Sequence, residues 1–72
     1  MEVRTVVEHT DGSYEYSDWD ESLRDKEELN TRAKKLGLRL TKDVTNVHII
    51  QNGKVKLILL HDIRSIAYEV RE

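Results

Sequence analysis

Two stretches of strand-forming residues, 44–51 and 54–61, are separated only by Asn52-Gly53. Asn-Gly is the dipeptide that a two-residue type I′ turn favours, because both central residues of that turn need a positive φ angle. The stretches therefore predict an antiparallel hairpin in which the numbers of facing residues add up to 105. On this register both faces of the hairpin carry large aliphatic side chains, so the rest of the chain must cover two apolar surfaces.

Further strands are predicted on either side of this hairpin. Residues 2–9 are rich in β-branched types, and Asp11-Gly12 separates them from 13–17, so we predict a second hairpin there. The segment 63–70 fits either a strand or one face of a helix. Its β-branched and aromatic residues favour a strand.

The residue pattern of 19–36 predicts one long helix. Asp18 suits the N-cap position, Glu21 completes a capping box, and Gly37 suits the position just past the end. Residues 1–72 are therefore expected to form a single α+β domain, with one amphipathic helix packed on a small, mainly antiparallel sheet. The apolar stripe of the helix consists of Trp19, Leu23, Leu29, Ala33 and Leu36.

One helix stripe covers only one face of the 44–61 hairpin. We assign it to the face with the longer aliphatic column, Val55, Leu57 and Leu59. The other face then presents an aliphatic patch that would forgo roughly 1.5–3 kcal/mol per side chain in water. We predict that this patch is the interface of a two-fold homodimer, and the N-terminal hairpin is the rival cover. The predicted interface residues are Val47, Ile49, Ile58 and Leu60.

The size and composition of the chain favour association. A chain of 72 residues buries only about 60% of its unfolded surface, and without cysteine no disulfide adds to the core. The absence of cysteine fits a cytoplasmic protein, and Met1-Glu2-Val3-Arg4 lacks the apolar segment of a signal peptide. The longest apolar run, Leu57 to Leu60, is far too short to span a membrane.

No residue pattern indicates catalysis, a cofactor or a metal. His48 and His61 fall on one face of the predicted hairpin but far apart along it, and His9 has no metal-motif spacing to either. Asp18 and Asp20 resemble an acidic metal pair, yet helix capping and the helix dipole explain them more simply. No serine has the spacing of an activated nucleophile, so we expect no enzyme.

A basic cluster supplies the alternative function. Residues 8–28 carry nine acids against two bases, whereas 29–72 carry nine bases against four acids. Contacts to phosphates would make the protein a weak nucleic-acid-binding module using residues 32–42. A protein is a more favoured partner than nucleic acid, because the chain has a net charge of −2 and the cluster lacks interleaved aromatic residues. The cluster consists of Arg32, Lys34, Lys35, Arg39 and Lys42, together with Lys54 and Lys56.

The aromatic residues are assigned to the core or its edge before a binding surface. A chain without phenylalanine needs other large side chains for its core. The residues concerned are Tyr14, Tyr16, Trp19 and Tyr68.

The order of the segments and the tail VHIIQNGKVKLILLHDIRSIAYEV, residues 47–70, resemble the Yopt family of small prophage-encoded bacterial proteins. The resemblance covers the whole chain, but it carries no catalytic motif and no functional residues. It implies a homodimer of monomers with one helix and three strands, whereas the residues themselves predict four or five strands. Together these observations predict a small homodimeric structural or interaction protein of prophage type, with no assigned activity and a host protein as a further partner.

Overall fold

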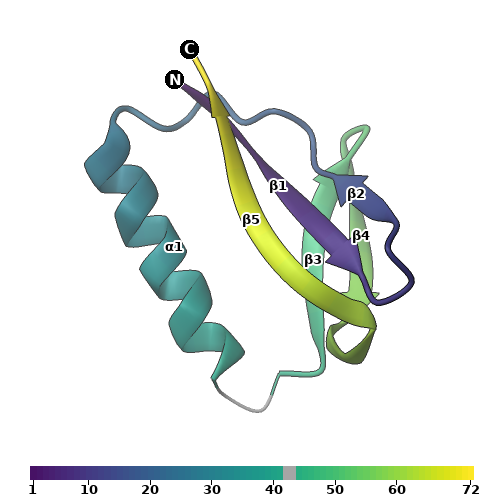
Figure 1. Ribbon diagram of the computed structural model, residues 1–72. Coiled ribbons are helices and arrows are strands. Elements are labelled where there is room, and N and C mark those ends of the chain that lie inside the picture. Colours follow the sequence, from purple (N-terminus) through teal and green to yellow (C-terminus); the bar gives the residue numbers. More distant parts are fainter. Residues whose placement is uncertain (42–43) are drawn as a thin grey trace.

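The computed structural model describes residues 1–41 and 44–72. The strands form two antiparallel sheets, which we term the main sheet, in the order β2-β1-β5, and the ribbon, β3-β4 (Figure 1). The predicted α+β class is confirmed. The described elements are β1 (Glu2–His9), β2 (Tyr14–Tyr16), α1 (Lys26–Leu40), β3 (Asn46–Gln51), β4 (Lys54–Leu59) and β5 (Ile63–Arg71).

The ribbon has the predicted register. Its pairs run from Asn46 with Leu59 to Gln51 with Lys54, so the facing numbers add up to 105. Asn52 has a φ of 52° and Gly53 a φ of 74°, the two positive values that a type I′ turn requires. The turn at this dipeptide therefore sets which residues share a face along the whole ribbon.

The main sheet confirms both the N-terminal hairpin and the strand at 63–70. β1 pairs with β2 on one side and with β5 along its length on the other. Ile66 faces Val7 and Tyr68 faces Thr5, so the period-two alternation of β5 matches that of β1. A short 3₁₀ turn, Leu60–Asp62, makes the corner between β4 and β5.

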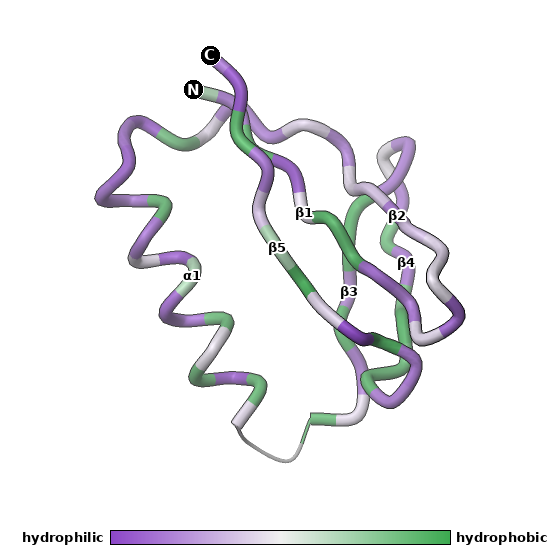
Figure 2. Tube along the Cα trace, in the orientation of Figure 1, coloured by the Kyte–Doolittle hydropathy of each residue, from purple (hydrophilic) through white to green (hydrophobic). Residues whose placement is uncertain are grey.

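The core lies between the main sheet and one face of the ribbon. Val7 of β1, Ile49 of β3 and Ile58 of β4 are buried together, and Ile63 and Ile66 pack against them. Figure 2 shows hydrophobic segments on β1, β3 and β5, while α1 alternates between hydrophobic and hydrophilic residues along its length. Sheet-on-sheet packing, rather than helix-on-sheet packing, therefore supplies this central cluster.

The helix begins at Lys26, so the predicted start at residue 19 is wrong. Asp25, not Asp18, is the N-cap, and its side chain accepts a hydrogen bond from the N–H of Glu28 at 2.9 Å. The carboxylate of Glu28 in turn accepts from the N–H of Arg24 at 3.0 Å. The acid pair of a capping box is therefore found later in the chain than predicted, and its second bond goes to the residue before the N-cap rather than to the N-cap itself.

Backbone pairing explains why the helix does not start earlier. The N–H of Asp18 donates to the carbonyl of Ile50 at 2.7 Å, and the N–H of Asp20 donates to the carbonyl of Val3 at 2.7 Å. Residues whose backbone N–H groups pair with neighbouring strands are extended and do not have helical φ and ψ angles. Trp19 and Leu23, which the predicted stripe includes, therefore precede α1.

The helix also continues past its predicted end. Gly37 lies inside α1, and the C-cap is Thr41, whose hydroxyl donates to the carbonyl of Leu38 at 2.7 Å. None of the residues of α1 is fully buried, although Leu29 and Leu36 are partly covered. In Figure 1 the helix runs alongside β5 at the edge of the molecule. The helix therefore buries less of its surface against the sheets than a helix in a protein core does.

Candidate interaction surface

The face of the ribbon that turns away from the core carries four exposed aliphatic residues, Ile50, Val55, Leu57 and Leu59, which we term the open face. Val55 and Leu57 are each 64% exposed, Leu59 51% and Ile50 43%. Ile50 faces Val55 across the ladder, so their side chains are neighbours, and Leu57 lies between the other two positions of β4. Contiguous exposed aliphatic residues of this kind mark interaction sites.

The same positions of β4 present free backbone groups. The N–H of Leu60 donates to the carbonyl of Thr45 at 3.0 Å, which identifies this pair as one that exchanges hydrogen bonds. Because such pairs alternate, the N–H and C=O groups of Val55, Leu57 and Leu59 point away from β3. Within the described residues no other backbone group bonds to them. The open face therefore adjoins an unpaired strand edge, a place where strands of other chains can add.

The predicted interface lies on the opposite face and is part of the monomer core, which corrects the assignment of the two faces. Ile49 and Ile58 are only 4% exposed, and Val47 and Leu60 are partly buried. The main sheet covers this face because β5 returns to pair with β1 and brings Ile63 with it. The helix does not cover the Val55-Leu57-Leu59 side, so that side is the one left in solvent.

Asp18 holds the turn of the ribbon rather than the start of the helix. One of its carboxylate oxygens accepts from the N–H of Asn52 at 2.8 Å and the other from the N–H of Gly53 at 2.9 Å. These two bonds lower the pKa of the Asp18 carboxyl below its ordinary value. No sequence spacing signals this contact, because Asp18 is 34 residues from Asn52 and 35 from Gly53. The acidic pair has no shared ligand, since Asp20 binds Arg32 at 3.0 Å instead.

Glu15 of β2 ties the main sheet to the ribbon. Its carboxylate forms an ion pair with Lys56 of β4, and its other oxygen lies 2.6 Å from Nε2 of His9. The hydrogen bond from Lys56, followed by that with His9, lowers the pKa of Glu15 although burial opposes the shift. Sequence reasoning did not single out Glu15, since only the tertiary structure brings the three side chains together.

The basic cluster is divided among separate contacts. Arg32 donates to Asp20 and, at 3.3 Å, to the hydroxyl of Ser22, while Lys56 is held by Glu15. These two cations are therefore engaged and not free for phosphates. Lys34, Lys35, Arg39 and Lys54 are exposed, and Lys42 lies outside the described residues.

The histidines lie on three different elements. His48 faces Leu57 as predicted, but the ladder ends at Asn46 and Leu59, so His61 does not face Val44 and lies in the 3₁₀ turn instead. There its ring is 3.3 Å from the carboxylate of Asp62. In the part of the chain that the structure describes, no three histidine or acidic side chains gather as metal ligands would.

The aromatic residues divide between the core edge and the surface. The ring of Trp19 contacts two guanidinium groups, that of Arg71 at 4.0 Å from the ring centre and that of Arg4 at 4.6 Å. Trp19 and Tyr68 are partly buried, as predicted for the core edge. Tyr14 and Tyr16 are exposed, so the same prediction is wrong for them.

No family model matches the chain, and no curated protein and no solved structure matches it. The resemblance to the Yopt family therefore stays a prediction, and the five described strands exceed the three that it implies. None of the described helices is long and apolar enough to cross a membrane.

Proposed function

We propose that this protein is a small homodimeric structural or interaction protein whose two copies meet through the open face of the ribbon. The exposure of Val55 and Leu57, each 64%, is the observation that carries this proposal. These side chains are large and lie two residues apart on β4, on the same face of the strand. A monomer with so few buried side chains gains most from covering them.

A second copy of the chain is a suitable partner because the open face carries no charge that would repel its own copy. Its positions on β3 and β4 carry no Lys, Arg, Asp or Glu, so two copies packed about a two-fold axis bring no like charges together. Face-to-face packing of two ribbons is ordinary sheet-on-sheet geometry, with about 10 Å between the sheets. Full burial of each aliphatic side chain would contribute up to roughly 1.5–3 kcal/mol.

The resemblance to the Yopt family supports the same proposal, since it implies a homodimer of prophage origin. We place the dimer in the cytoplasm, because a chain without cysteine suits a reducing compartment. A host protein is the second candidate for the open face. We expect no enzymatic activity.

The test is a pair of matched glutamate substitutions. Leu57→Glu puts a charge at the centre of the open face, whereas Leu38→Glu puts the same charge on α1, where the leucine is similarly exposed, at 65% against 64%. Light scattering after size exclusion should show a dimer for the wild type and Leu38→Glu, and a folded monomer for Leu57→Glu. A wild type that stays monomeric at micromolar concentrations, or a Leu57→Glu variant that remains dimeric, would contradict the proposal.

A further inference from the structure

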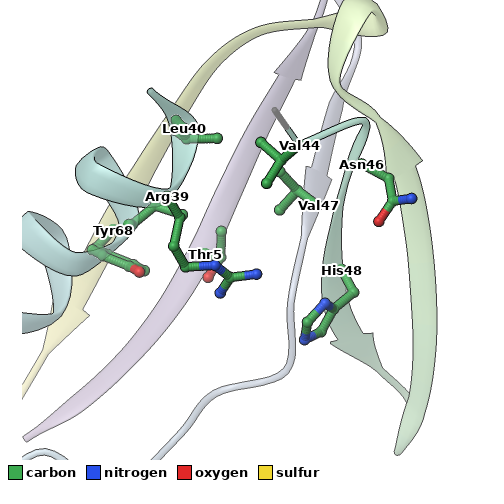
Figure 3. Close-up of a pocket in the computed structure, with 9 residues that line it drawn as sticks. Thr5, Arg39, Leu40, Val44, Asn46, Val47, His48 and Tyr68 are labelled. Atoms are coloured by element: carbon green, nitrogen blue, oxygen red, sulfur yellow. The ribbon is translucent and has the colours of Figure 1, made fainter. Parts of the chain in front are cut away.

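A cleft separates α1 from the sheets. It has a volume of about 630 Å³ and is lined by residues of β1, α1, β3 and β5, including Thr5, Arg39, His48 and Tyr68. It adjoins a smaller pocket of about 100 Å³ near the end of the helix (Figure 3). Small-molecule sites commonly measure about 300–1,000 Å³, so the cleft has the size of a ligand site.

Arg39 of α1 and His48 of β3 both line the cleft. Figure 3 shows the side chain of Arg39 extending from α1 past Thr5, with Tyr68 on the other side of the arginine and the ring of His48 on β3. Within residues 1–41 and 44–72 the guanidinium of Arg39 makes no hydrogen bond and no ion pair. A guanidinium presents its donors in a fixed fork that matches the two oxygens of a carboxylate or phosphate.

The acids that line the cleft do not compete for Arg39. Both oxygens of Asp18 accept from the turn of the ribbon, and Asp20 binds Arg32 and Ser22. Burial raises the pKa of Tyr68, so its hydroxyl keeps its proton and can donate to an anion. The local charge is therefore favourable to an anion although the whole chain carries a net charge of −2.

The rest of the lining is partly apolar and partly polar, since Arg4 and Ser17 also contribute to it. Trp19 and Ile50 form the accessible apolar wall, because Val3 and Ile49, which also line the cleft, are only 2% and 4% exposed. Such a wall suits the flat hydrocarbon part of a ligand, while a free inorganic ion would leave it uncovered.

We propose that this cleft binds a small organic anion, with its phosphate or carboxylate group paired to Arg39 and its apolar part against Trp19 and Ile50. The ligand would touch α1, β3 and β5 at once. The bound ligand would thereby stabilise the packing of α1, which has no fully buried residue, against the sheets. The cleft shares Ile50 with the open face, whereas Val55, Leu57 and Leu59 do not line it, so substitutions at Leu57 and Arg39 test the dimer and the cleft separately.

Titrations with phenyl phosphate and with benzoate, followed by amide chemical shifts in NMR spectra, test the proposal. Saturable shifts should appear at Thr5, His48 and Tyr68, and the tighter of the two probes identifies the preferred anionic group. Benzyl alcohol, which has the ring without the charge, should cause much smaller shifts. No saturable shift with either anion, or shifts confined to β4, would overturn the proposal.

Two charge-removing variants locate the anion. Arg39→Gln should weaken binding of the better probe at least about tenfold, which is the loss of one charge-assisted pair. Lys54→Gln removes the same charge at the exposed end of the ribbon and should leave binding unchanged. Arg39 is exposed, so its variant is expected to fold, and a circular dichroism spectrum checks this. Equal affinities of the wild type and Arg39→Gln, or equal losses in both variants, would rule out the site.

Discussion

Adjacent residues of the ribbon have opposite environments. Ile49 is 4% exposed and Ile50 is 43% exposed, although they are chemically identical neighbours. Successive side chains of a strand point to opposite faces, so this contrast follows from the register that Asn52-Gly53 imposes. The main sheet then covers one of the two faces and leaves the other in solvent.

Alanine substitution of these two isoleucines measures the contrast directly. Ile49→Ala should destabilise the fold by about 2–5 kcal/mol, because it removes buried methyl groups and leaves a cavity. Ile50→Ala should cost well under about 2 kcal/mol, since much of its side chain is already in water. Urea unfolding followed by circular dichroism, at concentrations that keep the oligomeric state the same, gives both values. Equal costs would mean that the ribbon is covered on both faces or on neither.

Two glycines play opposite parts in their elements. Gly37 lies within α1, where glycine disfavours the helix, and Gly53 lies in the turn of the ribbon with a φ of 74°. A Cβ atom added at either position would meet no other atom within 4 Å. Backbone conformation, rather than space, therefore decides what each glycine does.

Replacing each glycine with alanine should change stability in opposite directions. Gly37→Ala should stabilise the helix by about 0.5–1 kcal/mol, because alanine has the higher helix propensity. Gly53→Ala should destabilise the ribbon, because alanine is strained at a positive φ. Thermal unfolding and the helical signal in circular dichroism report both effects. A loss of stability in Gly37→Ala would indicate that the helix ends at this residue, as its position past residue 36 suggested from sequence.

Ionised carboxylates stabilise the folded protein at several places. The pKa values of several acids are lowered by hydrogen bonds from neighbouring side chains and backbone groups. A lowered folded-state pKa means that the ionised group stabilises the fold, and this contribution is lost as the pH falls through the folded pKa. The acids are Asp11, Glu15, Asp18, Asp20 and Glu28.

Glu15 offers a specific test of this acid sensitivity. Its ordinary pKa is 4.5 and the folded value is lower, so its contribution is complete above about pH 5 and disappears at lower pH. Glu15→Gln should be less stable than the wild type at pH 6 and should lose less stability between pH 5 and pH 3. Glu21→Gln, at an exposed position before α1, serves as the control. Urea midpoints measured across this range check the prediction, and parallel pH curves for wild type and Glu15→Gln would contradict it.

The sequence alone was sufficient for the features that depend on neighbouring residues. The Asn52-Gly53 turn, the register of the ribbon, the N-terminal hairpin and the strand at 63–70 follow from local φ preferences and from alternation of side chains. Tertiary structure alone decided the features that depend on distant partners. Pairing of Asp18 and Asp20 with β3 and β1 moved the start of the helix to Lys26, and the return of β5 buried Ile49 rather than Leu57. Both faces of the ribbon are aliphatic, so the choice between them depended on contacts between segments far apart in the chain.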